Sequence, residues 1–435
     1  MARLIDQALS QEEHVEPSGD AFSELEAAEN ELELESLMHE ATEAEHELDY
    51  FEYQQEELEH AVDVIDEIRA GLESSLEEDE RGIDAGTAQA YDLAYRAVVG
   101  QALPSPIASM ESFGGDTERK EATELSLEES KGRIRKIIDS IVQAIKSAWE
   151  SFKKFLKGIF DSATRLKKAA EKTKSQLEGA KKKGWTKKEE KFSAPKAARL
   201  QLGGDISASA IDSGLEVVAS DVVSNATTMT GDAVEYMSAI NQGFEKAKDD
   251  DPSSAFTKAS EKVSGWFKSR SKGEVGSKEL PGGKAVMISS VEGKIGDKEV
   301  TIPAPPRIDD HPQGTQSVKG EGEVEVPELD TLIGWCDAVI KGVDEIEKGR
   351  RARDQLAKTR KDLLDSIEEI KKAADKGALS AWWTQQNTRA ALWFANRNYD
   401  SAIARLDNFA IRYYRDVLSY VNAAVGKYQA PKDES

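Results

Sequence analysis

The segment LPSPIASMESFGG (residues 103–115) leads through ATELSLEES (122–130) into KGRIRKIIDSIVQAIKSAWESFKKFLKGIF (131–160), and this stretch sets the organisation of the chain. Its two prolines and its Gly-Gly pair interrupt regular helix. The last part repeats apolar residues every three or four positions, with Lys and Arg between them, which predicts a long amphipathic helix. We expect this helix to begin at a capping box, residues 126–129, and to continue to about Leu177.

Charge divides the chain at the same place. Residues 1–111 hold 31 of the 82 acidic side chains and four of the 58 basic ones, a net charge of −27. Residues 112–435 therefore carry a net charge of +3, within which residues 131–199 reach +14. A single cut in the backbone near residue 111 would therefore separate an anionic fragment from a mildly cationic one that contains a strongly basic segment. The cationic fragment could then bind anionic partners.

The N-terminal part is predicted to be an acidic helical arm. Apolar residues recur at helical spacing from Phe22 to about Ser75, and a second short helix is expected over residues 84–99. Glu dominates the exposed face of the first helix. Because like charges repel along such a face, we expect this helix to be only marginally stable without a basic partner.

The run GIDAGTAQAYDLAYRAVVGQALPSPIASMESFGGDTERKEATELSLEES (residues 82–130), with the Lys- and Trp-bearing helix after it, resembles the processed internal head (inner virion) proteins of large tailed bacteriophages. In that family the prohead protease removes an N-terminal propeptide by cutting after a Glu that follows a small residue two positions earlier. The resemblance implies a cleavage site formed by Ser109, Met110, Glu111 and Ser112, with Ser112 as the new N-terminus. Glu124 and Glu128 satisfy the same pattern, so whether further cuts occur there stays open.

The resemblance also implies where the protein works. It predicts synthesis in the bacterial cytoplasm, incorporation with the head assembly core, a final location inside the capsid, and possible delivery into the next host cell. The expected partners are the prohead protease, the capsid interior and packaged double-stranded DNA, which the basic helix would contact without sequence specificity. The residues that we expect to contact phosphates or a partner are Arg133, Arg135, Lys136, Lys153, Lys154 and Lys157.

Three alternatives remain open at this stage. A basic amphipathic helix with Trp and Phe can lie in a membrane interface, so the protein could be a membrane-active effector that its acidic prosegment holds inactive. It could also be an architectural coiled-coil protein that is never cut, or the segment around residue 111 could be an ordinary interdomain linker.

The remaining chain predicts a mainly α fold with a small α+β insertion. ARLQLGG (198–204) is expected to be a short strand, residues 207–268 two or three helices, and the stretch around Gly296-Asp297 a strand pair. Helices over 328–374 and 378–426, the latter aromatic-rich, would complete a three-helix bundle with the basic helix. The expected units are residues 1–111 (propeptide), 112–196 (hinge and basic helix), 197–310 (inserted domain), 311–327 (linker) and 328–435 (two long helices).

Nothing in the sequence predicts enzyme activity, a cofactor or a metal site. The pairs Glu43/His46 and Glu57/His60 have the spacing of some di-iron ligands, but chance explains them in a segment so rich in Glu. The single Cys336 lies in an apolar helical pattern, which favours a small buried side chain. We recognise neither a signal peptide nor a run of 18 apolar residues.

Overall fold

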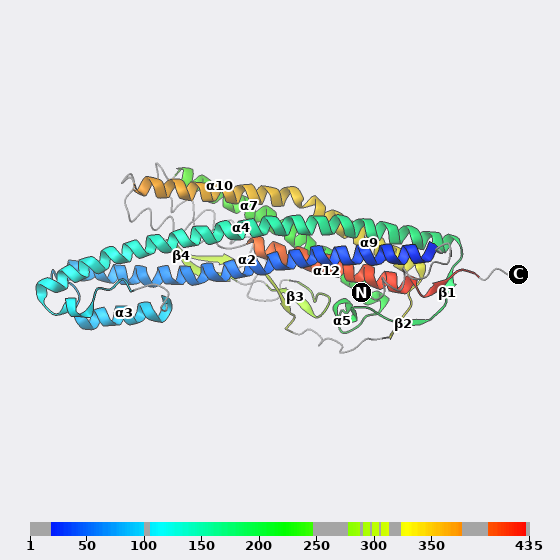
Figure 1. Ribbon diagram of the computed structural model, residues 1–435, viewed down its shortest axis with the longest axis horizontal. Helices are drawn as coiled ribbons and strands as arrows, with labels where there is room; N and C mark the ends of the chain where they lie inside the picture. Colours follow the sequence, from blue (N-terminus) through cyan, green and yellow to red (C-terminus); the bar gives the residue numbers. More distant parts are fainter. Residues whose placement is uncertain are drawn as a thin grey trace, which may run out of the picture.

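The computed structural model describes residues 19–99, 105–246, 277–287, 290–295, 298–303, 306–312, 323–375 and 399–431. These residues form an elongated molecule whose long axis follows two helices of unusual length (Figure 1). Among the described residues, strands occur only in two-stranded pairs. The predicted mainly α fold is confirmed.

Helices α2 (Gly19–Glu78) and α4 (Asp116–Lys182) run side by side in opposite directions along this axis (Figure 1). At a rise of 1.5 Å per residue, the 67 residues of α4 span about 100 Å. The predicted apolar face of α4 is buried along its length and packs in part on the apolar face of α2. The buried residues of this face include Ile134, Ile137, Ile141, Ile145, Phe152, Phe155, Ile159, Leu166 and Leu177 of α4, and Leu48, Ile65, Ile68 and Leu72 of α2.

The predicted start of the basic helix is wrong. Helix α4 begins at Asp116, directly after Gly114 and Gly115, and Ser126 is buried well inside it. The Ser126 hydroxyl donates to the Ala122 carbonyl (2.7 Å) and accepts from the Ala108 N–H (2.9 Å). Ser126 therefore holds the preceding segment against the helix and does not cap it.

The acidic arm is a packed part of the molecule. Helix α2 shares one continuous hydrophobic core with the rest of the chain, and Ile65 and Leu72 are fully buried in it. Helix α3 (Ala85–Val99) folds back against α2 at one end of the molecule, where Tyr95 is buried (Figure 1). The expected self-repulsion along the Glu-rich face is offset by basic residues on neighbouring helices.

The C-terminal helices also differ from the prediction. The single helix expected over residues 328–374 is two, α9 (Leu329–Lys348) and α10 (Arg350–Asp375), separated at Gly349. A Cβ at Gly349 would collide with the Arg353 guanidinium, which is fully buried and paired with Asp407, so a larger residue there would displace that ion pair. Helix α12 (Tyr399–Val425) follows. Residues 376–398, including Trp382, Trp383, Trp393 and Phe394, lie outside the described residues.

The stretch ARLQLGG does not form the predicted strand. Residues 197–200 form one helical turn, α5 (Ala197–Leu200), and Leu202 then pairs with Asp205 across a tight turn. Gly203 and Gly204 in that turn have positive φ, which favours a loop over an extended strand. The helices that follow are α6 (Ala208–Val217), a π-helical turn η2 (Val218–Val223) and α7 (Ser224–Lys246).

These helices pack on the bundle, whereas the sequence predicts a separate inserted unit. Helix α7 lies against α10 and α12, and α6 lies against α9. The Trp335 indole N–H of α9 donates to Asp212 Oδ1 of α6 (2.6 Å), and the buried Tyr413 hydroxyl of α12 donates to the Ile211 carbonyl (3.3 Å). Side chains of α6, η2 and α7 thus belong to the common core.

The strands tie loops together at the surface of the bundle. The strand pair around Gly296-Asp297 is confirmed as β4 and β5. The expected linker 311–327 is wrong at its end, because residues 323–325 there form strand β7, which pairs with β2 at residues 191–193. Phe192 of β2 packs on Tyr420 with ring centroids 5.0 Å apart. The four antiparallel pairs are β1 (Thr186–Lys187) with β8 (Tyr428–Gln429), β2 (Lys191–Ser193) with β7 (Glu323–Glu325), β3 (Lys284–Met287) with β6 (Arg307–Asp310), and β4 (Ser290–Ile295) with β5 (Lys298–Pro303).

Candidate processing site and the charged surfaces around it

The predicted cleavage residues lie on a short turn before α4. Ser109 is exposed and extended, and residues 110–113 form a 3-10 turn, η1 (Met110–Phe113). Within it Glu111 is exposed and Ser112 is half-buried, its N–H donating to the Ser109 carbonyl (2.8 Å). The side chain that the sequence pattern marks as the recognition residue is therefore accessible to a protein in solution.

This turn is held on both sides. Before it, Ile107 is buried and the Ala108 N–H is bound by the Ser126 hydroxyl. After it, the Phe113 ring is 3% exposed. A protease that binds its substrate as an extended strand must first open this turn, which is a local unfolding step at a site with few backbone hydrogen bonds.

Two other sites fit the same sequence pattern but lie inside α4. Glu124 and Glu128 are exposed, whereas the small residues two positions earlier, Ala122 and Ser126, are buried against the hinge and the core. Extending the chain at either position requires several turns of a long packed helix to unwind. Of these three positions, residue 111 is the one whose backbone lies outside the long helix.

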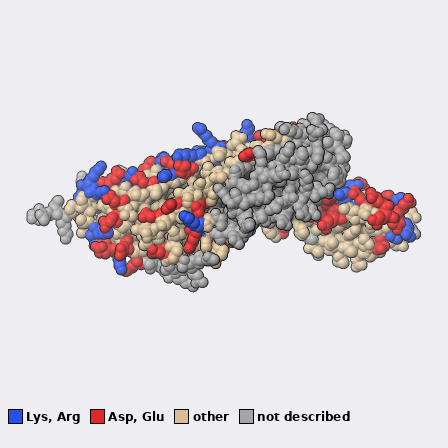
Figure 2. All heavy atoms as spheres, turned by 180° about the vertical axis from the view of Figure 1, so that it is seen from behind, with Lys and Arg blue, Asp and Glu red and all other residues tan. Residues whose placement is uncertain are grey.

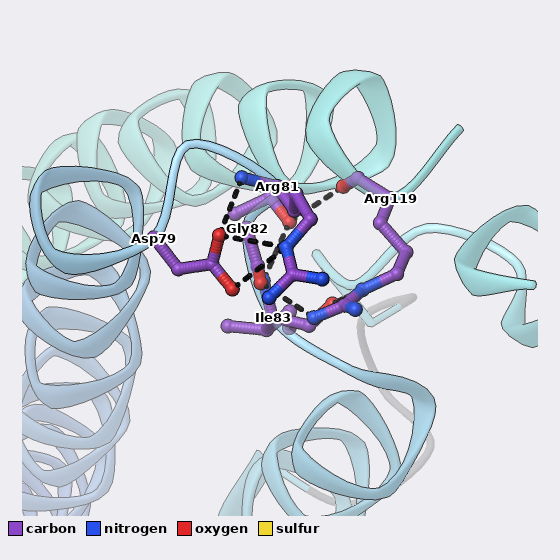
Figure 3. Close-up of polar contacts among 6 residues, drawn as sticks. Asp79, Arg81, Gly82, Ile83 and Arg119 are labelled. Carbon is purple, nitrogen blue, oxygen red and sulfur yellow. Dashed lines mark hydrogen bonds and ion pairs between the residues drawn. The ribbon is translucent and has the colours of Figure 1, made fainter. Parts of the chain in front are cut away.

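Residues on the two sides of Glu111 are joined by a polar clamp (Figure 3). The Arg119 guanidinium of α4 donates to the carbonyls of Gly82 (2.8 Å) and Ile83 (3.0 Å), in the turn that follows α2. The Ile83 N–H donates to the Thr123 hydroxyl (3.1 Å), which itself donates to the Arg119 carbonyl (2.7 Å). A cut at Glu111 would leave this clamp as a contact between two separate pieces.

Glycine is required at position 82 of the clamp. Its φ of +76° lies in the left-handed region, and a Cβ there would sit 2.3 Å from the Thr123 hydroxyl oxygen. The turn is closed on its outer side by Arg81, whose Nε lies 3.0 Å from Asp79 Oδ1. The Arg81 guanidinium and N–H lower the pKa of the Asp79 carboxyl.

The six basic residues predicted to contact phosphates lie along α4, but three of them have acidic neighbours. Lys153 Nζ is 2.6 Å from Glu150 Oε1 and 5.5 Å from the Trp149 ring, Lys154 Nζ is 4.0 Å from Glu47 Oε2 of α2, and Arg133 Nη2 is 3.9 Å from Glu129 Oε2. Arg135, Lys136 and Lys157 are exposed as well, and Arg135 also has an interaction partner. Basic and acidic side chains alternate over the described part of the face in Figure 2.

A second group of α4 cations is paired with α9. Lys167, Lys174 and Lys181 meet Asp344, Asp337 and Asp330, with Nζ–Oδ1 distances of 2.6 Å and 2.7 Å for the first two pairs. Both helices place these residues seven apart, so antiparallel packing brings the pairs into register. The hydrogen bonds that Lys167 and Lys174 donate to these aspartates raise the pKa of both lysines. The charges of these three lysines are therefore matched by α9.

A third set of polar contacts fixes α2 on α12. Arg405 binds Asp49, Asn408 binds Glu45 and Arg412 binds Thr42. The neighbouring Glu47 accepts a hydrogen bond of 2.6 Å from Ser151 of α4, and Ser151 is itself buried. The acidic arm is thus held by named cations of the C-terminal helix as well as by apolar packing.

Beyond these contacts, cations of α5 and α12 gather around one carboxylate. Asp416 is 1% exposed, and Lys196 Nζ (3.6 Å), Arg199 Nη1 (3.6 Å) and Arg415 Nη2 (3.1 Å) surround it. Arg412 lies one turn before Asp416 on α12; burial lowers its pKa, Glu45 of α2 opposes this, and Arg199 and Arg415 lower it further. We call Lys196, Arg199, Arg412 and Arg415 the α5–α12 cation cluster. The sequence pattern does not predict this cluster, because Lys196 ends the basic segment, Arg199 lies in the predicted short strand, and Arg412 and Arg415 lie in the aromatic-rich last helix.

The described residues contain no group of three or more His, Cys, Asp or Glu side chains that could hold a metal ion. Cys336 is buried, and burial raises the pKa of its thiol to about 12. No described helix is both long and apolar enough to cross a bilayer.

The family model of phiKZ-like phage internal head proteins matches residues 29–429, which is most of the chain. The chain therefore belongs to this family, and its role is that of a structural protein of the phage head interior. The match includes most of α2, the turn at residues 110–113 and most of the C-terminal helices. Neither a curated protein nor a solved structure matches the chain.

Proposed function

We propose that this internal head protein enters the prohead with its acidic arm in place, is cut after Glu111 by the prohead protease, and then stays with the packaged DNA or leaves with it. The observation that carries the proposal is the coincidence of three features at one turn. The small-x-Glu motif, the change in net charge and an exposed Glu111 side chain all occur there. No catalytic role is proposed for any residue.

The packing of α2 changes what such a cut would do. Ile65, Ile68 and Leu72 are fully or almost fully buried, and burial of each such side chain stabilises the packed state by roughly 1.5–3 kcal/mol. Together with the α2–α12 contacts this is too much for one backbone break to release. We therefore propose that the cut produces a nicked molecule in which the arm stays bound until a competitor replaces its acidic side chains.

The membrane-active alternative has no support. A helix that inserts into a membrane interface needs a free apolar face. The apolar face of α4 is buried against α2, α9 and α12, with Phe152 and Phe155 fully buried. The uncut architectural protein is the alternative that the experiment must exclude.

The deciding measurement is the N-terminal residue of the protein recovered from mature particles. We expect Ser112, and we expect Glu111→Gln to leave the full-length chain in the particles. Glu124→Gln is the matched control, since it makes the same change in an exposed Glu of the same motif and should leave processing unaltered. Recovery of the intact N-terminus from wild-type particles would refute the proposed maturation.

A further inference from the structure

One exposed face of α2 carries residue types that are unusual for an acidic helix in contact with solvent. Among the described residues, four large aromatic or aliphatic side chains are mainly exposed, and two of them, Tyr50 (57%) and Tyr53 (59%), lie on this face. The exposed positions in line with them hold Glu and His. We call this row the α2 stripe, which consists of Glu43, His46, Tyr50, Tyr53, Glu57 and His60.

The α2 stripe has the spacing of a coiled-coil seam. Its members follow one another at alternating steps of three and four residues, which keeps them in one row over about 26 Å of helix. All six side chains are exposed, whereas the opposite face of α2, with Leu48 and Ile65, is buried in the core. The stripe is therefore a second face of α2, on the side away from the bundle.

The order of residue types along the stripe is self-complementary. The two tyrosines lie at its centre, and each Glu on one side of the centre stands at the same distance from it as a His on the other side. In an antiparallel pair of stripes that places Tyr50 opposite the partner's Tyr53, His46 faces the partner's Glu57 and Glu43 faces the partner's His60. A parallel pair would instead place like residues opposite each other. Charge complementarity thus selects the antiparallel arrangement.

We propose that the α2 stripe is a self-association surface, which binds the same stripe of a second copy of this chain in antiparallel orientation about a two-fold axis. Each contact then occurs twice, as in any isologous interface. The tyrosines supply the centre of the contact, because they combine a large apolar ring with a hydroxyl that forms hydrogen bonds. The His–Glu pairs on both sides fix the register. The proposal depends neither on cleavage nor on DNA association.

Contacts within the chain already order the stripe. The Tyr53 hydroxyl donates to Glu57 Oε1 (2.5 Å), and Gln54 Nε2 donates to the Tyr50 hydroxyl (2.6 Å). A carboxylate accepts several hydrogen bonds, so Glu57 can bind the partner's His46 as well. Side chains that are held before association lose less conformational freedom when a partner binds.

Repulsion between two acidic helices opposes this association. Part of it is reduced within each chain, because Glu47 accepts a hydrogen bond from Ser151 of α4 and Asp49 binds Arg405 of α12. These acidic groups beside the stripe are thereby directed towards their own bundle. The remaining repulsion and the small size of the seam predict a weak dimer, which forms at high protein concentration.

The first test measures the oligomeric state of the full-length chain by sedimentation velocity over a range of concentrations. A pH of about 6 is suitable, because imidazole side chains then carry part of a positive charge. We expect a monomer–dimer equilibrium that Tyr50→Glu with Tyr53→Glu shifts to the monomer. The matched control, Leu93→Glu with Leu125→Glu, makes the same change of charge at the other two exposed large side chains and should leave the equilibrium nearly unchanged. Circular dichroism verifies that both variants fold.

The second test exchanges charges across the proposed contact. Glu57→Lys places a cation opposite the partner's His46 and should raise the dissociation constant several-fold, although it lowers the net negative charge of α2. Glu67→Lys makes the same change at an exposed position of α2 beyond the stripe and should not weaken the dimer. Adding His46→Glu to Glu57→Lys brings opposite charges together again and should restore the affinity.

The third test determines the orientation. Chains with His46→Cys are mixed with chains with Glu57→Cys and treated with a short bifunctional thiol reagent, and the wild-type chain serves as the blank because Cys336 is buried. The antiparallel arrangement predicts cross-linked dimers in the mixture and few from either variant alone, since equal positions are then about 16 Å apart along the helix axis.

The outcomes are decisive for the α2 stripe. A wild-type chain that stays monomeric at high micromolar concentration would overturn the proposal, and so would a dimer that the tyrosine variant and its control affect equally. Efficient cross-linking of either cysteine variant on its own would contradict the antiparallel arrangement. The proposed cleavage after Glu111 and the proposed DNA association stand or fall on their own measurements.

Discussion

Arg353 of α10 and Asp407 of α12 form a bidentate ion pair in the interior of the bundle, with Nε–Oδ2 at 2.8 Å and Nη2–Oδ1 at 2.6 Å. Both side chains are fully buried. Seven residues along each helix, Arg360 pairs with Asp400 in the same antiparallel register, also buried. A shift of α12 along α10 would leave these four charges without partners in the core. The pairs therefore specify the register of the two helices.

We predict that Arg353→Met destabilises the protein by about 3–5 kcal/mol, because it leaves the Asp407 carboxylate buried and unpaired. Lys174→Gln, which removes half-exposed ion pairs with Asp337 and Glu178, should destabilise the protein far less. The double variant Arg353→Met with Asp407→Leu should recover most of the loss. Chemical denaturation measures all three. If Arg353→Met and Lys174→Gln lowered the free energy of unfolding equally, the buried Arg353–Asp407 pair would have no special role in folding.

The polar clamp gives a second prediction. Gly82→Ala should destabilise the turn after α2 by roughly 1–3 kcal/mol, because alanine at positive φ is strained and its Cβ meets the Thr123 hydroxyl. Gly132→Ala is the matched control. It has open space around its Cβ within α4 and should stabilise the helix by about 0.5–1 kcal/mol. Thermal unfolding measures both, and a neutral Gly82→Ala would mean that the clamp is not closed in solution.

The buried thiol and the buried tyrosine hydroxyls have raised pKa values, so we predict that the protein loses stability at alkaline pH. Burial raises the pKa of Cys336 from 9.0 to about 12 and the pKa of Tyr428 to about 12, and it also raises the pKa of Tyr413, Tyr414 and Tyr420. An unfolded chain loses these protons at lower pH than the folded one. The stability that they contribute is therefore fully present below about pH 9 and is lost as pH rises towards 12.

Chemical labelling of the Cys336 thiol measures this loss of stability. At mildly alkaline pH the native chain should react with a thiol reagent only at the rate of unfolding, and the rate should increase steeply as pH approaches the range in which the chain unfolds. Denatured protein under the same conditions is the control. Rapid labelling of the native chain would show that Cys336 is accessible and that α9 is not packed as described.

The sequence was sufficient for the long basic helix and its apolar face, because one period of three to four residues continues without a break from Ile134 to Leu177. The beginning of that helix was not predictable in the same way. Ser126 has the local pattern of a cap, but tertiary contact with Ala108 makes it a buried hydroxyl inside α4. Local signals cannot distinguish these two roles.

The charged surfaces were harder to predict, for a physical reason. The pairs of Lys167, Lys174 and Lys181 with α9 exist only once two helices are placed in register, and each helix alone shows ordinary surface charges. The packing of the acidic arm on the bundle was hard to predict for the same reason. Its acidic face predicts self-repulsion, and the cations that offset this, Arg405 and Arg412, lie far along the chain.

The last prediction concerns what a cut near residue 111 releases. A protease recognition sequence inserted between Gly114 and Gly115, in the loop before α4, allows the full chain to be folded first and cut afterwards. We expect the two pieces to co-elute in gel filtration without denaturant and to separate in urea. Ile65→Asp, which places a carboxylate in the shared core, should make the arm dissociate on cutting, whereas Glu67→Gln should not. Separation of the wild-type pieces in plain buffer would mean that the tether alone holds the arm. Maturation would then expose α12 at once, without a competitor such as DNA.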